Sequence, residues 1–263
     1  MPCFFCARDA KLTREHVIPR WLRKPLGDTP RWEMDMWYRT ELEMEKSPPL
    51  WRRRTDQILR RVCGDCNSGW MSNLEVEVRP LLEPLIAGEV LVVSSSDQDL
   101  LRRWALKTAA VLGPLQRAPD AVCPELRLRL AEGVPLDNRV GLWAVPLAAD
   151  EPDPYQWRFS LLLDEPYEDP AFNITGLPLG RIGFEVLNLN HPDRLAFDRL
   201  PALTPSFYQP VAPLAAGPAL LPSPTSAPSA LEAAGVPFGI RATQMTAICR
   251  ELGMRVAAPP TPN

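Results

Sequence analysis

Long apolar runs are missing from this sequence of 263 residues. No stretch approaches the roughly 18 apolar residues that a membrane-spanning helix needs. The first residues, MPCFFCARDAKLTREH, also lack the apolar segment behind a positive start that a secretory signal contains. Both absences predict a cytoplasmic protein without a membrane partner.

Histidine is nearly absent, because the chain contains only His16 and His191. His191 stands in Asn-His-Pro-Asp, a pattern typical of a turn before proline. No glycine-rich nucleotide loop, catalytic triad or internal repeat is present in the second half of the chain. Any chemistry that depends on an imidazole therefore falls on His16.

An excess of positive charge is also missing, since the formal net charge is −3. This value argues mildly against a nucleic-acid partner. The charge is uneven, however: residues 1–80 hold 15 basic and 12 acidic side chains, and the remainder holds 14 and 20. Arginines cluster near His16 and before Cys63, either as solvated surface charges or as contacts to nucleic-acid phosphates. The candidates for such contacts are Arg14, Arg20, Arg53, Arg54, Arg60 and Arg61.

Four of the six cysteines form two Cys-x-x-Cys pairs, Cys3 with Cys6 and Cys63 with Cys66. Each such turn brings two thiolates to one side, at the spacing that a tetrahedral Zn²⁺ requires. In a cytoplasmic protein, metal binding is favoured over disulfides. We therefore predict a structural zinc that joins two segments 56 residues apart. Cys123 and Cys249 are interpreted as buried or incidental thiols.

The residues around the two cysteine pairs predict a strand and a helix. His16 is followed by Val17 and Ile18, which favour extended backbone, and Pro19 ends it. After Cys66, apolar residues recur at helical spacing up to Leu85, and Asn67 stands at the start of this helix. A zinc ion on the four cysteines would hold the helix start close to the strand that carries His16.

The order of these motifs resembles the four-cysteine type of HNH endonuclease. The motifs are Cys-x-x-Cys, Glu-His-Val-Ile-Pro and Cys-x-x-Cys-Asn-x-Gly, and the match extends from Cys3 to about Leu85. The stretch CNSGWMSNLE also looks like a subgroup of uncharacterised bacterial and phage HNH proteins. The resemblance implies a ββα-metal fold and hydrolysis of nucleic-acid phosphodiesters, with DNA as the expected substrate.

The resemblance also implies roles for individual residues. His16 falls on the general base that deprotonates the attacking water, and Glu15 and Asn67 fall on the ligands of a catalytic Mg²⁺ or Mn²⁺. The family more often has Asp where Glu15 stands. Its middle Asn, which orients the catalytic His, has no equivalent in the stretch 55–62, where Asp56 or Gln57 are the available substitutes.

The rest of the chain predicts an α+β organisation. Residues 1–88 form the zinc-stapled module, with an inserted segment at 25–55 whose aromatic residues favour a small hairpin core over stacking on bases. Helices are expected at 97–115 and 124–132, and strands at 139–146, 156–163 and 181–189. We interpret 97–200 as an α+β domain with antiparallel strands, 201–230 as a proline- and alanine-rich linker or ordered coil, and 231–263 as a helix and tail.

Two other functions remain open from the sequence. The chain is a zinc-structured nucleic-acid-binding module with impaired catalysis, or it is a protein-interaction adaptor whose zinc is architectural. The C-terminal domain is available in each case for a homodimer contact or a partner protein. Nucleic-acid binding predicts an affinity that falls steeply with salt, whereas the adaptor predicts no such affinity.

Overall fold

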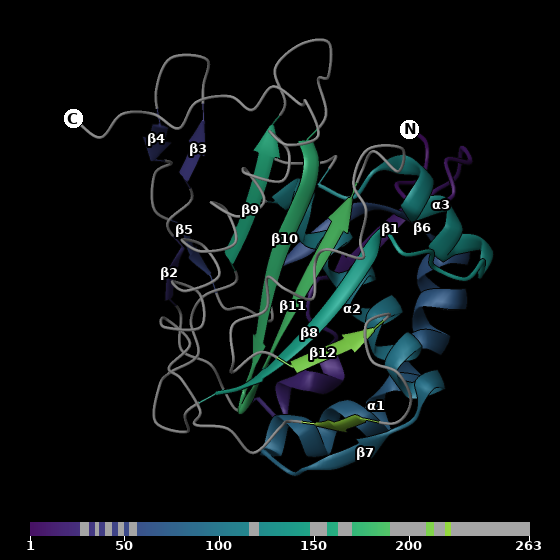
Figure 1. Ribbon diagram of the computed structural model, residues 1–263. Coiled ribbons are helices and arrows are strands. Elements are labelled where there is room, and N and C mark those ends of the chain that lie inside the picture. The colour runs from purple at the N-terminus through teal and green to yellow at the C-terminus, as the bar shows by residue number, and fades with distance from the viewer. Residues whose placement is uncertain are drawn as a thin grey trace.

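The computed structural model describes residues 1–26, 57–115, 121–147 and 170–189, and the short strands at 32–34, 37–39, 44–46, 50–52, 157–162, 209–212 and 219–221. An antiparallel sheet lies at the centre, and helices gather on one side of it (Figure 1). The chain is thus of mixed α+β class with antiparallel strands, as the sequence predicts.

The N-terminal part is built from two paired strands and a helix. β1 (Leu12–His16) pairs antiparallel with β6 (Ile58–Cys63), although the inserted segment separates them in sequence. The pairing is irregular, because Thr13 lies opposite Val62 while Glu15 lies opposite Leu59. This irregularity leaves one more residue on β6 than on β1 and changes the direction of the side chains that follow.

The second cysteine pair leads directly from β6 into a helix. A distorted turn, η3 (Cys66–Met71), contains non-helical backbone at Gly69 and continues into α1 (Ser72–Ala87). The expected apolar spacing is present, and the buried residues of α1 are Leu74, Val78, Leu82, Leu85 and Ile86. α1 ends at Gly88, whose positive φ of 87° is readily accessible to glycine.

α2 (Ser95–Leu115) is the central helix of the molecule. It packs against α1 on one side and against the central sheet on the other. Trp104 of α2 is fully buried and meets Phe184 of the sheet edge to face, with ring centroids 6.4 Å apart. α3 (Pro124–Glu132) follows and ends at Gly133, as its sequence predicts.

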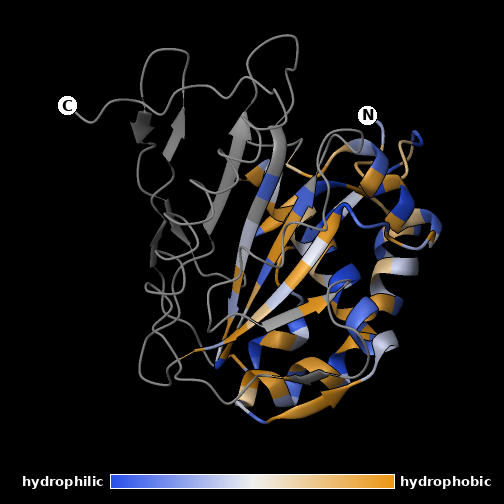
Figure 2. Cartoon of the chain, viewed as in Figure 1, coloured by the Kyte–Doolittle hydropathy of each residue, from blue (hydrophilic) through white to orange (hydrophobic). Residues whose placement is uncertain are grey.

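Five of the described strands form the central sheet in the order β12–β8–β11–β10–β9, with every neighbouring pair antiparallel. Their bounds are β8 (Val140–Pro146), β9 (Trp157–Leu162), β10 (Pro170–Leu179), β11 (Ile182–Leu189) and β12 (Gln209–Ala212). β8, β9 and β11 agree with the predicted strands, whereas β10 was not predicted. Figure 2 shows hydrophobic residues on β8, β11 and the helices.

Short elements complete the described structure. β2 (Trp32–Met34) pairs with β5 (Leu50–Arg52), and β3 (Trp37–Arg39) pairs with β4 (Met44–Lys46), within the segment expected to hold a hairpin. β7 (Leu91–Val93) pairs with β13 (Ala219–Leu221). The region 201–230, expected to be a linker or coil, therefore differs from that expectation by contributing β12 and β13 to sheets. The helix expected near 240–255 lies outside the described residues.

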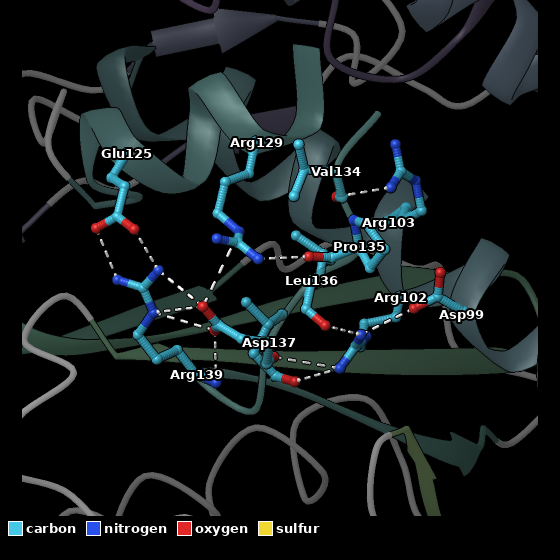
Figure 3. A network of polar contacts seen from close by, with 11 residues as sticks. Asp99, Arg102, Arg103, Glu125, Arg129, Val134, Pro135, Leu136, Asp137 and Arg139 are labelled. Atoms are coloured by element: carbon cyan, nitrogen blue, oxygen red, sulfur yellow. Dashed lines mark hydrogen bonds and ion pairs between the residues drawn. The ribbon is translucent and has the colours of Figure 1, made fainter. Parts of the chain in front are cut away.

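A network of charged side chains connects α3, α2 and the start of β8 (Figure 3). The guanidinium of Arg139 donates to both carboxylate oxygens of Glu125, at 2.9 and 2.7 Å, and to Asp137. Arg102 of α2 donates to the backbone carbonyls of Leu136, Asp137 and Val140. These bonds fix the connection that leads from the helices into the sheet.

One hydrophobic cluster includes residues from the N-terminal module, the helices and the sheet. It extends from Cys3 to Leu221 and includes buried residues of α1, α2 and β8. The helices that the structure describes include none that is both long enough and apolar enough to cross a lipid bilayer.

Candidate functional site

The four paired cysteines converge on one point. Their sulfur atoms all lie within 4.8 Å of one another, and Cys3 to Cys66 and Cys6 to Cys63 are both separated by 3.8 Å. Zn–S bonds of about 2.3 Å in a tetrahedron place sulfurs about 3.8 Å apart, whereas a disulfide would place them at about 2.05 Å. The donor set and its spacing therefore fit a four-thiolate metal site such as zinc.

The surroundings favour the thiolate at Cys6, whereas burial raises the pKa of the Cys63 and Cys66 thiols. The backbone amide of Cys63 donates to the sulfur of Cys3 at 3.3 Å, and that of Cys66 donates to the sulfur of Cys63 at 3.5 Å. Burial opposes ionisation of Cys6, but hydrogen bonds with Arg8 and with the other thiols lower its pKa to about 6. A thiol of this pKa is already deprotonated at neutral pH, which is the form that binds a metal.

His16 stands at the end of β1, partly exposed. Its Nε2 accepts a hydrogen bond from Nε of Arg20 at 3.4 Å. Burial lowers the pKa of His16, and the positive charges of Arg20 and Arg23 lower it further. The imidazole is therefore neutral at neutral pH, which is the form that can accept a proton from water.

Asn67, at the start of η3, links the helix to β1. Its side-chain Nδ2 donates to Oγ1 of Thr13 at 2.9 Å and to the backbone carbonyl of Arg14 at 3.1 Å. The cysteine cluster and Asn67 thus hold the strand that carries His16 against the start of the helix. The amide nitrogen acts as a donor here, so its oxygen is the atom that a cation would use.

Glu15 points into the protein interior, in contrast to the neighbouring His16. Its side chain is 7% exposed, and its Oε1 lies 3.1 Å from the ammonium nitrogen of Lys107 on α2. The same nitrogen lies 2.8 Å from Oε1 of Glu75 on α1. Burial raises the pKa of Glu15 and Lys107 opposes this change, whereas the two carboxylates outweigh burial and raise the pKa of Lys107. Lys107 therefore remains a cation between two carboxylates.

Glu75 connects this ion cluster to the histidine. Its carboxylate acts electrostatically on His16, where it favours the protonated imidazole against the effect of the arginines. Burial and the arginines outweigh this effect, so the net pKa of His16 is lowered.

The arginines expected to contact nucleic acid lie on the surface of the same region. Arg14, Arg20, Arg60 and Arg61 are exposed. Across the irregular pairing, Arg14 of β1 lies opposite both Arg60 and Arg61, because Thr13 pairs with Val62 and Glu15 with Leu59. The guanidinium of Arg61 also lies over the ring of Phe4, at 5.5 Å. Arg53 and Arg54 lie outside the described residues.

Gln57, a possible substitute for the middle Asn, lies directly before β6. Its side chain is buried, and its backbone carbonyl accepts a hydrogen bond from the amide of Val17 at 3.0 Å. This bond extends the contact between the ends of the two strands just beyond His16. Asp56, the other substitute, and His191 are outside the described residues.

Sequence reasoning missed Glu75 and Lys107. Lys107 interrupts an apolar stripe on α2 whose neighbours Trp104, Ala105 and Thr108 are all buried. A lysine in such a stripe is a detectable signal, because a buried lysine requires a partner. The partner itself was not deducible, since Glu15 and Lys107 are 92 positions apart.

The chain was compared with protein-family models, with curated proteins and with solved structures. None of the three comparisons gave a match.

Proposed function

We propose that this protein hydrolyses nucleic-acid phosphodiester bonds as an HNH-type endonuclease, with DNA as the expected substrate. The observation that carries the proposal is the environment of His16. A neutral imidazole stands at the end of a strand that the cysteine cluster and Asn67 hold against a helix start, with exposed arginines around it. The same strand–strand–helix order supports the resemblance to the ββα-metal fold.

The chemistry follows from these groups. Once Arg20 releases Nε2, His16 accepts a proton there from a water molecule, and the resulting hydroxide attacks phosphorus. The P–O bond to the leaving oxygen breaks, that oxygen takes up a proton from solvent water, and His16 returns its own proton to solvent. Arg20, 3.4 Å from the imidazole, and the exposed Arg14 supply positive charge for the phosphate and its transition state.

The resemblance adds Mg²⁺ or Mn²⁺, held by Glu15 and Asn67, which would stabilise charge at the phosphate. In this structure the pair does not form such a site, because Glu15 is bound by Lys107 and the Asn67 amide donates to β1. Glu15 would have to exchange Lys107 for the ion. No step of the hydrolysis is therefore assigned to a divalent cation.

Plasmid nicking by the zinc-loaded full chain tests the proposal, with Mg²⁺, with Mn²⁺ and without either ion. His16→Ala should reduce cutting by at least about 100-fold, the usual contribution of a general base. The matched control is His191→Ala, which removes the second histidine of the chain and should leave cutting unchanged. Zinc content must be the same in all three proteins.

Cutting by His16→Ala at the rate of the unaltered protein would refute the role of His16. A second function, nucleic-acid binding without catalysis, is favoured by one observation, the engagement of Glu15 by Lys107. It predicts salt-dependent binding of a duplex, a single strand or RNA, with no cutting of any of them. Absence of both binding and cutting would favour the adaptor.

A further inference from the structure

Lys107 is the most deeply enclosed charge near the His16 centre. Its side chain is 0% exposed, and its ammonium nitrogen is shared by Glu15 at 3.1 Å and Glu75 at 2.8 Å. Transfer of an ammonium group from water to the interior is costly unless opposite charges compensate for it. These two carboxylates come from different elements, β1 and α1, and both turn toward the lysine on α2.

The two carboxylates also require a positive charge, because they share one ammonium nitrogen. Glu15 and Glu75 lie on either side of one point, so they would repel each other if nothing positive stood between them. A divalent metal is the usual solution where oxygen ligands converge, and it would require several of them at about 2.0–2.6 Å. Here the distances are those of hydrogen bonds to an ammonium group.

No second metal centre accompanies the cysteines in the part of the chain that the structure describes. There the four cysteines are the one group of three or more His, Cys, Asp or Glu ligands that converges on a common point. His16, Glu15 and Glu75 do not form such a group. The two carboxylates instead share the ammonium of Lys107.

We propose that the ammonium of Lys107 is the resident cation of the His16 centre: it holds Glu75 together with Glu15, which the resemblance makes a ligand of a divalent metal. That Lys107 is the cation bound by the two carboxylates does not depend on the proposed function. Its effect on cutting does rest on that function. Lys107 is a positioning residue, because it binds Glu15, the neighbour of His16 on β1, and does not contact the imidazole in any described bond.

Because Lys107 lies on α2, this helix contributes to the His16 centre together with β1 and α1. Trp104, one turn before Lys107, is fully buried, and Thr108 donates its hydroxyl hydrogen to the backbone carbonyl of Trp104 at 2.9 Å. Lys107 therefore lies among residues that are buried on the same part of α2. A divalent ion must displace the ammonium before it can bind Oε1 of Glu15.

Binding of Mn²⁺ to the zinc-loaded full chain, followed by the electron paramagnetic resonance of free Mn²⁺, tests the assignment. The unaltered protein should show no stoichiometric site that depends on Glu15. Lys107→Met removes the charge at similar length, leaves the two carboxylates together, and should bind Mn²⁺ at least ten-fold more tightly. Adding Glu15→Gln to Lys107→Met should return the affinity to that of the unaltered protein.

A stoichiometric Mn²⁺ site in the unaltered protein that Glu15→Gln removes would overturn the assignment. An unchanged Mn²⁺ affinity in a folded Lys107→Met protein would overturn it as well. If Lys107→Met does not fold, comparison of the unaltered protein with Glu15→Gln still decides the question. None of these measurements uses nucleic acid, so they can fail while the plasmid assay succeeds, and the reverse.

The plasmid assay adds a readout of positioning. Lys107→Arg keeps a cation between the carboxylates and should retain more cutting than Lys107→Met. Mn²⁺ should restore cutting to Lys107→Met at concentrations that fill its new site. Equal loss in both variants, with no recovery by Mn²⁺, would assign Lys107 a role in folding alone.

Discussion

At the scale of single residues, Arg139 shows how a buried charge is stabilised away from the proposed site. Its side chain is 8% exposed and contacts Glu125 and Asp137, which are 59% and 37% exposed. The hydrogen bonds from Arg139 lower the pKa of Glu125, and they outweigh burial to lower the pKa of Asp137. Both carboxylates are therefore more acidic in the folded protein than in the unfolded chain.

Replacement of Arg139 should make the stability depend less on pH. A lowered folded pKa contributes stability above the unfolded pKa of about 4, and this contribution disappears as the pH falls through the folded pKa. Arg139→Met should lower the free energy of unfolding by about 1–3 kcal/mol at pH 7, a range reduced for solvent exposure. The loss should shrink below about pH 4. Urea unfolding at a series of pH values measures it.

Arg79→Met is the matched control, because Arg79 forms an exposed ion pair with Glu83, with side chains 52% and 40% exposed. Its guanidinium also lies over the ring of Trp21, 5.5 Å from the centroid, so the effect should stay within about 1 kcal/mol and should not change with pH in the way that the Arg139 effect does. At low pH the cysteines become protonated and release any bound metal, and this loss of stability is the same in both variants. The difference between the two variants therefore reports the effect of Arg139 alone. A loss in Arg139→Met that does not change between pH 3 and 7 would contradict the assigned role.

Residues with short-range signals were predictable from the sequence, and those that meet across the fold were not. The spacing of Cys3, Cys6, Cys63 and Cys66 predicts their convergence, because Cys-x-x-Cys turns are local structures. The position of Asn67 beside the strand of His16 follows from that convergence. The contact of Glu15 with Lys107 depends on how α2 packs, and nothing near either residue specifies it.

At the scale of elements, the turn between β10 and β11 is locked to the end of α1. The backbone amide of Arg181 donates to the carbonyl of Ile86 at 3.1 Å. Gly180 has a φ of +60°, and a Cβ at this position would lie 2.8 Å from the same carbonyl oxygen of Ile86. A side chain at 180 therefore meets both a strained backbone conformation and rigid backbone atoms.

Gly180→Ala should lower the free energy of unfolding by about 2–4 kcal/mol, which combines left-handed strain of about 1–2 kcal/mol with a displacement of the turn. Gly133 is a matched control, since it has a φ of +70° but open space where a Cβ would lie. Gly133→Ala should cost about 1 kcal/mol. Equal costs in urea unfolding would show that the contact with Ile86 carries no energy.

The helices of this chain were easier to predict than its strands. Gly133 ends α3 where its sequence indicates, and the apolar stripe of α2 gives nearly the observed bounds. β10 was missed because it begins at Pro170 and contains Gly176 and Pro178, which are residues typical of breaks. Pairing with β9 and β11 on its two sides outweighs that local preference.

At the scale of the whole molecule, the cysteine cluster should be worth a large part of the stability. It connects the N-terminal turn, β6 and the start of η3, and three of its four cysteines are buried. Structural zinc sites contribute folding free energy directly. Cys3→Ser should therefore abolish stoichiometric zinc and lower the melting temperature by at least about 10 °C.

Cys123→Ser is the control, because Cys123 is buried but lies outside the cluster. It should keep one zinc per chain and melt within a few degrees of the unaltered protein. Elemental analysis and a thermal melt measure the two quantities. A Cys3→Ser protein with full zinc content and unchanged melting would show that the cluster is not the metal site.

The boundaries between units are the part of the organisation that the sequence least resolves. The extent of the resemblance, from Cys3 to about Leu85, favours a separate module, yet one hydrophobic cluster includes Leu82 of α1, Leu101 of α2 and Phe184 of the sheet. The sequence indicates where polar segments lie, but it does not indicate which apolar faces of helices and strands pack against each other. Here α2 contacts both α1 and β6 of the N-terminal part and the strands of the central sheet.

The inserted segment at 25–55 lies between Val17 and Gln57, and a backbone bond joins these two residues. The amide of Val17 bonds to the carbonyl of Gln57, and β1 and β6 continue the pairing toward the cysteines. Because the entropy of closing a flexible loop rises by only about 0.6 kcal/mol for each doubling of its length, such an insert can vary at small thermodynamic cost. Evolution, or an engineer, can therefore lengthen or shorten the segment 25–55 while the bond between Val17 and Gln57 keeps the two strands together.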